Sequence, residues 1–556
     1  MKVKPPSRRR EILADQYPVW ETLTIAAALD RAVKLYPDRP LILTDDRVFS
    51  YTQVKHESRR LASGLIAAGL EPGGHVALIM ANYPEFALLK FAIARAGAVC
   101  VPINFMLRAR ELAYVLDQSD SSILVTMGRF RDHDHLADLA SIREQLPKLR
   151  HVVTLDALDT LRAMATAQSD AELARREAVA DGNTLSDIVY TSGTTGRSKG
   201  VMLTHDMVLR AAFSSALTRA FEDGRRIQFA LPMYHVFGYV ECLVACMFVG
   251  GAIIPHATFD PAGMLDAAER HRASETVCVP MMTHRLIELA RERGFDSSSL
   301  VAMFNSGGVN VPSVWSEIRS ILGASEVLTA YGMTETTAST TCTVPEGDDR
   351  HLLATNGCFK LAGSAGDPAI GNRVAIYKVI DPATGADLPS DSEGELVAKG
   401  PTVTKGYYRK PEETAAAFTP DGWLRTGDVG RISAEGYLTL TGRIKESYRC
   451  GGEMVMPREI EEIFDDHPAI AQALVVGIPD RKMGEVGCLC VIPRGIDLPD
   501  ASALIAYCAE RLARFKVPRH VLFMTAGEIP LTVTGRPQKF KLAIEAARRV
   551  AAQQGE

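Results

Sequence analysis

The chain has 556 residues, 47% of them hydrophobic and 23% charged, a globular composition that is too long for a single core. Its net charge of −5 argues against a nucleic-acid-binding protein, which would carry a basic surface. The N-terminal Met1–Pro6 segment has no apolar stretch behind its charges, so we expect that it is not a secretory signal.

The first predicted elements alternate between helix and strand. Val54, Leu61 and Leu65 place apolar groups on one helical face, and Gly69 stands where such a helix would stop. Residues 76–80 form a short apolar run, Pro84 can open the next helix, and residues 98–103 form another apolar run. Strands that are apolar throughout, without alternating apolar and polar residues, are typical of a parallel sheet that is covered on both faces.

A glycine-rich loop joins two further apolar strands, over residues 187–190 and 201–203. The loop, residues 191–200, contains three glycines, the hydroxyl side chains of threonine and serine, and Lys199, a mixture that suits phosphate oxygens. It is not a Walker A loop, because the fifth residue after Gly193 is Ser198 rather than glycine. The alternative interpretation is a flexible turn without a ligand.

The most membrane-like segment, residues 236–255, contains Glu241 and Gly250-Gly251 and ends at a proline. These features favour a buried helix followed by a buried strand over a membrane span. The ten cysteines are scattered without a Cys-x-x-Cys pair, so we expect them to be core residues of a cytoplasmic protein.

The pattern changes near residue 375. Short runs over residues 395–398 and 437–440, separated by Gly, Pro and Asp, predict antiparallel strands. An α+β block then follows, with a helix start over 457–464, a strand over 473–478 and a helix over 501–512. We therefore expect an α/β protein with three parts. These are a large N-terminal domain (1–443) of parallel-rich, helix-covered sheets with a small antiparallel barrel-like part, a hinge (444–446), and a small mobile C-terminal domain (447–556).

At the glycine-rich loop the sequence resembles the adenylate-forming superfamily, specifically its acyl-CoA synthetases, whose signature is Thr-Ser-Gly-Thr-Thr-Gly-x-Pro-Lys-Gly. Only the proline is missing, replaced by Ser198. Further blocks match in the family order: residues 231–235, 331–335, 422–428, 442–445 and 452–461. The resemblance thus extends over most of the chain, and it implies a carboxylic acid–CoA ligase that works through an acyl-adenylate.

The resemblance also implies residue roles. Glu335 would hold Mg²⁺, a hard cation that prefers carboxylate and phosphate oxygens. Tyr331 would stack on adenine, Thr334 would bind the α-phosphate, and Asp428 and Arg443 would hold the ribose. The nucleotide site of ATP or AMP would comprise Thr191, Ser192, Gly193, Thr194, Thr195, Lys199, Gly308, Val309, Asn310, Tyr331, Gly332, Thr334, Asp428 and Arg443. Lys445 would be the hinge about which the small domain swings, and Gly451 and Gly452 would let the arm of CoA pass.

The acyl pocket implied by the resemblance includes His235, Phe237, Glu241, Gly307 and Gly332. Amino-acid-activating relatives carry an aspartate at this block, whereas here His235 is followed by Val236 and Phe237. We therefore expect an apolar or aromatic acid. Glu241 would either bond a substrate hydroxyl or lie in a solvated corner.

One departure bears on the reaction. Family members use a lysine near the C-terminus for adenylation, in a Thr-x-Thr-Gly-Lys-x-x-Lys stretch, and here Arg536 stands at its place, three residues before Lys539. A guanidinium is larger and planar, and it does not replace a compact ammonium group at a developing negative charge. We hypothesise an enzyme that makes acyl-CoA from a preformed adenylate, supplied by a partner ligase, and that adenylates poorly. The catalytic set is then Arg536, Lys445, Glu335 and His235.

Several alternatives stay open. Arg536 or Lys539 could support adenylation, giving a complete two-step synthetase, or the acceptor could be a carrier protein instead of CoA. A nucleotide-binding scaffold for a partner ligase and a luciferase-like oxidation are further readings. The sequence leaves the acid and the oligomeric state, including a homodimer, undefined.

Overall fold

The computed structural model describes residues 3–191, 198–306, 312–444, 446–450, 453–480, 483–495, 500–512, 514–532 and 535–554. The chain divides into two compact units. The first contains residues 1–376 and 398–424, and the second contains residues 377–397 and 425–556.

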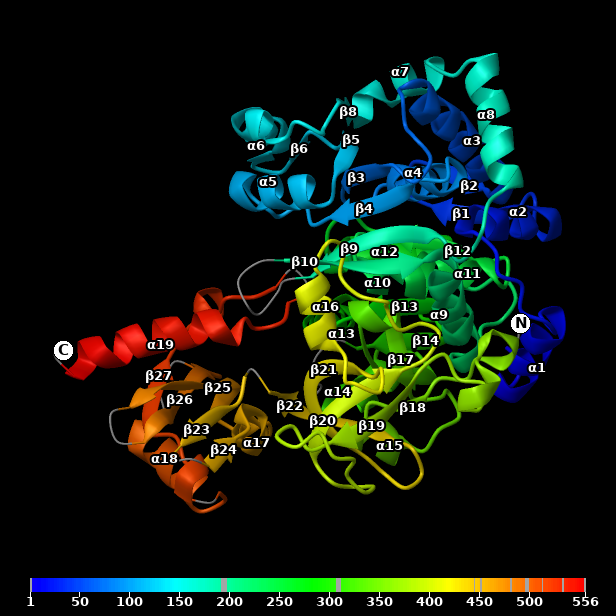
Figure 1. Cartoon of the computed structure of the whole chain (residues 1–556). Coiled ribbons are helices and arrows are strands. Elements are labelled where there is room, and N and C mark those ends of the chain that lie inside the picture. The colour runs from blue at the N-terminus through cyan, green and yellow to red at the C-terminus, as the bar shows by residue number, and fades with distance from the viewer. Residues whose placement is uncertain are drawn as a thin grey trace. The chain divides into compact units, whose positions relative to one another are not determined.

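Two large sheets, both mostly parallel, form the first unit (Figure 1). Antiparallel pairing occurs only at one edge of each described sheet, between β1 and β2 and between β9 and β10. The seven-stranded sheet has the order β15 (Glu326–Leu328), β14 (Ala302–Asn305), β13 (Glu275–Cys278), β11 (Arg226–Phe229), β12 (Ala252–Pro255), β1 (Pro40–Leu43), β2 (Val48–Ser50). The six-stranded sheet has the order β10 (Lys199–Thr204), β9 (Leu185–Thr191), β4 (Val99–Ile103), β3 (His75–Ile79), β5 (Ser121–Thr126), β8 (His151–Thr154).

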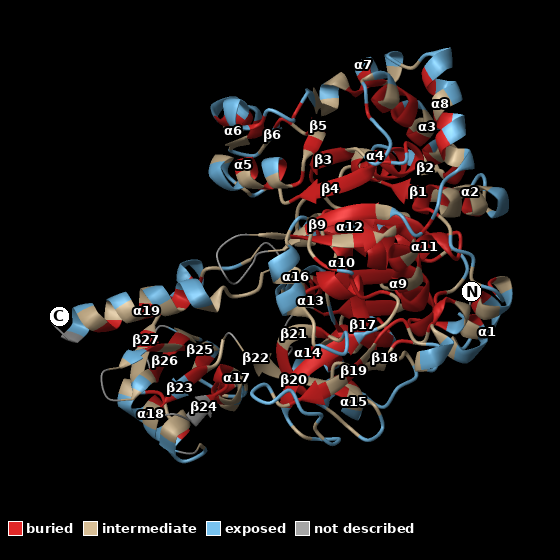
Figure 2. Cartoon of the chain, in the orientation of Figure 1, coloured by how far each residue is buried: buried red, intermediate tan, exposed pale blue. Residues whose placement is uncertain are grey.

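Helices cover these sheets, and the predicted strand–helix–strand unit is confirmed as β3, α4 and β4. Helix α4 is buried along almost its whole length, as Figure 2 shows, because it packs between other elements on every side. The helices of this unit are α1 (Pro6–Gln16), α2 (Ile25–Leu35), α3 (Tyr51–Ala67), α4 (Pro84–Arg95), α5 (Ala109–Gln118), α6 (His135–Ile142), α7 (Leu158–Ala163), α8 (Ala167–Ala178), α9 (His205–Thr218), α10 (Val236–Gly238), α11 (Ala245–Met247), α12 (Pro261–His271), α13 (Pro280–Arg293), α14 (Pro312–Ser320), α15 (Asp349–Ala354) and α16 (Pro411–Ala417).

The buried helix predicted between residues 236 and 255 is confirmed, with one difference. Its middle, Tyr239–Val244, is wound as a π-helix between α10 and α11, and strand β12 follows it. Within the described residues, no helix combines the length and the apolar character needed to cross a bilayer. All ten cysteines are free thiols, and nine of them are buried, as expected for core residues.

The first unit also has a two-stranded sheet, β6 (Arg129–Phe130) and β7 (His133–Asp134), and a three-stranded antiparallel sheet, β16 (Ala330–Met333), β17 (Ala338–Cys342) and β18 (Cys358–Phe359). The first hairpin of the three-stranded sheet, β16–β17, carries the predicted nucleotide residues Tyr331 to Glu335.

The second unit has two sheets. The four-stranded sheet is β19 (Ile376–Ile380), β20 (Gly394–Lys399), β21 (Leu424–Ile432) and β22 (Leu438–Arg443). The five-stranded sheet contains β24 (Glu453–Val455), β23 (Tyr448–Cys450), β26 (Gly484–Pro493), β25 (Ile470–Asp480) and β27 (His520–Phe523), with helices α17 (Pro457–Glu461), α18 (Ala501–Ala509) and α19 (Lys539–Gln554).

The five-stranded sheet and its helices enclose a hydrophobic core whose described members all lie between Tyr448 and Val550. The α/β class, with parallel-rich sheets and a separate small C-terminal domain, is therefore confirmed. The bounds 1–443, 444–446 and 447–556 stay a prediction, because the compact grouping also places strands β19 to β22 with the C-terminal residues.

Candidate active site

The two strands that flank the glycine-rich loop lie side by side. Strand β9 ends at Thr191 and β10 begins at Lys199, and these two residues are antiparallel partners. The chain therefore leaves and re-enters the sheet at one point, as a phosphate loop requires. Ser192, Gly193, Thr194 and Thr195 lie outside the described residues.

Glu335 and Lys199 meet at a residue that the sequence analysis did not select, Tyr407. Its hydroxyl donates to Glu335 Oε1 at 3.1 Å, and Lys199 Nζ lies 4.8 Å from the centre of its ring. Burial, and then the Glu335 carboxylate, raise the pKa of Tyr407, so the phenol stays a neutral donor. The backbone N–H of Thr404 donates to the Glu335 carbonyl at 2.8 Å, which fixes the residue further. A carboxylate and an ammonium group thus flank one tyrosine.

The β16–β17 hairpin positions Tyr331, Gly332 and Thr334. Tyr331 and Thr334 are buried, whereas Gly332 is exposed. A Cβ on Gly332 would lie 2.1 Å from the carbonyl oxygen of Ala338, so only glycine lets the two strands approach this closely. At Gly332 the hairpin therefore presents backbone without a side chain.

Asp428 and Arg443, the predicted ribose residues, are antiparallel partners in β21 and β22 of the second unit. Arg443 Nε lies 2.6 Å from Asp428 Oδ1, and the Asp428 side chain is almost fully buried while Arg443 is partly exposed. The strand pairing therefore brings this predicted pair together. Its role toward a ribose stays a prediction.

His235 and Phe237 lie at the start of helix α10, in the predicted acyl block. Both are half-buried, and the Phe237 ring packs edge-on against Phe304 at 5.5 Å. Burial lowers the pKa of His235, so its imidazole is neutral at neutral pH. The block before them is held by Asn82, whose amide nitrogen donates to the Leu231 carbonyl at 2.9 Å and whose oxygen accepts from Met233 N–H at 2.7 Å.

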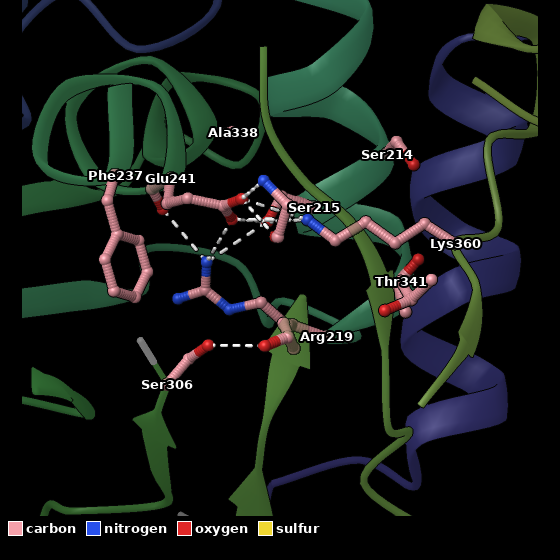
Figure 3. A network of polar contacts seen from close by, with 12 residues as sticks. Ser214, Ser215, Arg219, Phe237, Glu241, Ser306, Ala338, Thr341 and Lys360 are labelled. Carbon is pink, nitrogen blue, oxygen red and sulfur yellow. Dashed lines mark hydrogen bonds and ion pairs between the residues drawn. The ribbon is translucent and has the colours of Figure 1, made fainter. Parts of the chain in front are cut away.

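Glu241 is fully buried in the π-helix (Figure 3), and the expectation of a solvated corner is therefore wrong. Its carboxylate pairs with Lys360 at 3.1 Å and with Arg219 at 3.3 Å. Burial opposes its ionisation, but Lys360 and Arg219 outweigh this and hold the pKa of Glu241 below its ordinary value. That Glu241 reaches the acyl group stays a prediction.

Arg536 lies in the second unit, in the turn that precedes α19. Its guanidinium is 3.6 Å from Glu446, the last residue of the predicted hinge. Lys539 lies 3.8 Å from Glu446 and forms a 2.7 Å ion pair with Glu461. Lys539 is also largely buried, with 12% of its side chain exposed, so the second lysine of the family stretch is held in place by two carboxylates.

Seven further predicted residues lie outside the described part of the chain. They are Gly307, Gly308, Val309, Asn310, Lys445, Gly451 and Gly452.

Sequence reasoning missed Tyr407, Asn82, Lys360 and Arg219. Each contacts a predicted residue through tertiary structure: Lys360 is 119 positions from Glu241, and Asn82 is 151 from Met233. No local spacing marks such pairs. The one usable signal was a buried-looking charge, Glu241, inside an apolar helix, because a buried carboxylate requires a cation elsewhere in the chain.

The fit of Mg²⁺ can be judged from the donor set. Among the described residues, no group of three His, Cys, Asp or Glu side chains could hold a metal ion by itself. Glu335 supplies one fixed carboxylate, and Lys199, whose ammonium group lies over the Tyr407 ring, could attract phosphate. Mg²⁺ commonly binds through one or two carboxylates together with substrate phosphates. This arrangement therefore fits a Mg²⁺ ion that is also coordinated by the phosphates of the nucleotide.

Family models match both parts of the chain. Residues 29–408 match the model described as AMP-binding enzyme, and residues 459–536 match the AMP-binding enzyme C-terminal domain. The two matches together contain most of the predicted site residues.

Curated relatives and solved structures agree with these matches. A 3-[(3aS,4S,7aS)-7a-methyl-1,5-dioxo-octahydro-1H-inden-4-yl]propanoyl:CoA ligase of Mycobacterium tuberculosis is 37% identical over 527 residues, covering 93% of this chain and 98% of that protein. A feruloyl-CoA synthase of Amycolatopsis is 31% identical, covering 91% and 96%. ATP-bound MatB of Rhodopseudomonas palustris has a TM-score of 0.81 and 29% identity, covering 94% and 99%.

Proposed function

The chain belongs to the AMP-binding enzymes, as a member of their acid–CoA ligases, and we propose that it forms an acyl-CoA thioester through an acyl-adenylate, with a weakened adenylation half. The main observation that supports nucleotide binding is that Lys199 and Glu335 both contact Tyr407. A positive and a negative group held about one tyrosine suit a phosphate and its counter-ion.

In this proposal the substrate carboxylate attacks the α-phosphorus of ATP, releasing pyrophosphate, and the CoA thiolate then displaces AMP. Lys199 would attract the phosphates, Thr334 would donate to the α-phosphate, and the buried Glu335 would hold Mg²⁺. The ion would supply neutralising charge on the phosphate oxygens. His235, neutral because burial lowers its pKa, would line the acyl side without bringing a positive charge toward it.

The weak adenylation half rests on Arg536 and on the surroundings of Lys539. Arg536 cannot place a single compact ammonium charge between carboxylate and phosphate. Lys539, the other candidate for that task, is paired with Glu461 at 2.7 Å and lies near Glu446. Moving it into a cleft would leave both carboxylates without that cation. These contacts support a thioester-forming enzyme that receives its adenylate from a partner ligase.

The substrate is proposed to be an apolar, bulky or aromatic acid. Phe237 packs on Phe304 beside His235, which supplies an apolar lining. The Mycobacterium tuberculosis relative is named for a bicyclic propanoyl group and the Amycolatopsis relative for a feruloyl group, which supports the same class. Both acids are therefore suitable test substrates.

The two half-reactions can be measured separately. Pyrophosphate release from ATP plus each acid reports adenylation, and acyl-CoA formation from the preformed acyl-adenylate plus CoA reports the second step. Arg536→Lys should raise adenylation by roughly 10²-fold, the scale of restoring one well-placed charge donor, and should leave the second step unchanged.

Arg519→Lys is the matched control, because Arg519 is also partly exposed in the second unit and pairs with Asp480 at 3.2 Å. It should change neither step. Fast pyrophosphate release by the wild-type protein would favour the complete two-step synthetase, and its loss in Lys539→Met would then assign the task to Lys539.

A further inference from the structure

The π-helix Tyr239–Val244 carries two polar side chains that reach different parts of the nucleotide site. Such widened turns are rare and concentrate at functional sites. Tyr239 and Glu241 are both fully buried here, within the helix predicted to line the acyl pocket. A buried polar group in an apolar helix needs a partner, and the identity of each partner is informative.

Tyr239 is bonded to the strand that leads into the phosphate loop. Its hydroxyl donates to Asp187 Oδ2 at 2.8 Å, and Asp187 lies in β9, which ends at Thr191. Lys90 pairs with the other oxygen of Asp187, and its ammonium group lies 4.6 Å from the centre of the Tyr239 ring. Burial, and then the Asp187 charge, raise the pKa of Tyr239, so the phenol remains a donor.

Glu241 is bonded to the hairpin that carries Glu335. The Ser339 backbone N–H donates to Glu241 Oε1 at 3.0 Å, and the Ser339 hydroxyl donates to the same oxygen. Ser339 is the strand partner of Gly332, and the chain between them contains Thr334 and Glu335. The carboxylate therefore holds the closing strand of the predicted nucleotide hairpin.

The segment between Glu335 and Ser339 needs such a hold. Thr337 and Ala338 have φ angles of 57° and 80°, in the left-handed region that disfavours side chains with a Cβ. The Thr337 hydroxyl is fixed to the Thr402 carbonyl at 2.7 Å, and Ser339 is fixed to Glu241. A strained backbone conformation persists only where surrounding contacts hold it in place. Through Ser339, Glu241 therefore stabilises the turn at Thr337 and Ala338, which follows Glu335 in the chain.

The charge of Glu241 is balanced inside a wider buried cluster. Lys360, Arg219 and the Ser215 hydroxyl contact its carboxylate (Figure 3). Arg219 also pairs with Glu275. Glu275 is equally buried, but in the described contacts its carboxylate meets Arg219 and Arg225 and does not reach the hairpin. The chain thus contains two comparable buried glutamates, and only one of them touches Ser339.

We propose that Tyr239 and Glu241 are positioning residues that couple the acyl-pocket helix to the two nucleotide segments. Displacement of the π-helix moves β9 through Asp187 and moves the Glu335 hairpin through Ser339. The affinity for AMP then depends on the position of the acyl-pocket helix. The inference rests on the proposed function, since it takes Thr334 as a nucleotide ligand and Glu335 as the residue that would hold Mg²⁺.

Calorimetric titration with AMP tests the coupling in the full-length protein. Ser339→Ala removes one hydroxyl contact and leaves every buried charge in place, and Tyr239→Phe removes the bond to Asp187. Each should weaken AMP binding by about three- to tenfold, the range expected for one lost hydrogen bond. Ser339→Thr retains the hydroxyl and should retain most of the affinity.

Glu241→Gln and Glu275→Gln form the matched pair, because each removes one negative charge from the same buried cluster. With the folded fraction checked by circular dichroism, only Glu241→Gln should weaken AMP binding, by about tenfold. Equal losses in both would overturn the inference and assign the effect to unbalanced charge. Unchanged affinity in Ser339→Ala and Tyr239→Phe would also overturn it. If the wild-type protein did not bind AMP, the proposed function would fail with it.

Discussion

Asp465 lies directly after the last helical turn of the α17 region, where the helix dipole is unfavourable for a carboxylate. Burial is the largest cause that raises its pKa, from 3.8 to about 6, and the carboxylates of Glu462 and Asp466 add to it against Arg458. The folded chain therefore binds the Asp465 proton more tightly than the unfolded chain does.

The sign of the pH dependence follows from this shift. Between the unfolded pKa of 3.8 and the folded pKa of about 6, the folded state holds more protons, so stability falls as the pH rises through this window. Asp465→Asn should then stabilise the second unit by about 1 kcal/mol near pH 7.5, after allowance for solvent screening. It should change stability much less near about pH 4, where the folded state is protonated and the unfolded chain is only partly ionised. Urea unfolding at the two pH values measures this, and an equal gain at both would contradict it.

Asn82 shows how one side chain joins two elements. It follows β3 of the six-stranded sheet, yet its amide nitrogen donates to the carbonyls of Leu231 and His256, which follow β11 and β12 of the seven-stranded sheet. Its oxygen accepts from Met233 N–H. The three strands end together at carboxyl edges, where ligands of α/β sheets bind. Asn82 therefore holds the acyl block against the neighbouring sheet.

Asn82→Ala should loosen this block. It leaves the Met233 N–H and two carbonyls without their partner, at a cost of about 1–3 kcal/mol in stability. The KM for the acid should rise more than the KM for ATP, because the lost bonds hold the segment that leads to His235. Steady-state kinetics on both substrates measures the ratio. Asn82→Asp keeps the acceptor but not the donor and should give the same pattern. Equal rises in both KM values would show a general loss of structure instead.

The elements that could be predicted from sequence are those that local pattern determines. The strands around residues 76–80 and 98–103 and the helix opened by Pro84 follow from unbroken apolar runs and a proline at a helix start. The π-helix could not be predicted, because its two polar contacts lie far away in the chain: Glu241 meets Ser339, 98 positions later. The same holds for Tyr407, which reaches Glu335 across 72 positions. Motif matching selected the predicted site residues, but not the residues that hold them.

At the scale of the whole molecule, the chain contains separate hydrophobic cores. The principal core of the first unit combines residues from Leu13 to Ala365, and the core of the C-terminal residues is formed only between Tyr448 and Val550. Domains with their own cores can unfold independently. The domain movement that the family resemblance implies would need this independence, because neither core may depend on a contact that changes during the movement.

Differential scanning calorimetry should therefore resolve two unfolding transitions. AMP should raise the midpoint of the larger transition, since the predicted phosphate residues Lys199 and Thr334 belong to the first unit and a ligand stabilises the part that binds it. The predicted ribose residues Asp428 and Arg443 lie in β21 and β22, outside the C-terminal core, so AMP should leave the smaller transition unchanged. At about 100 times its dissociation constant, AMP should add about 2.7 kcal/mol to that unit. Asp465→Asn should shift only the smaller transition, which identifies it as the unfolding of the C-terminal core. A single transition that both AMP and Asp465→Asn displace as a whole would show that the two cores unfold cooperatively.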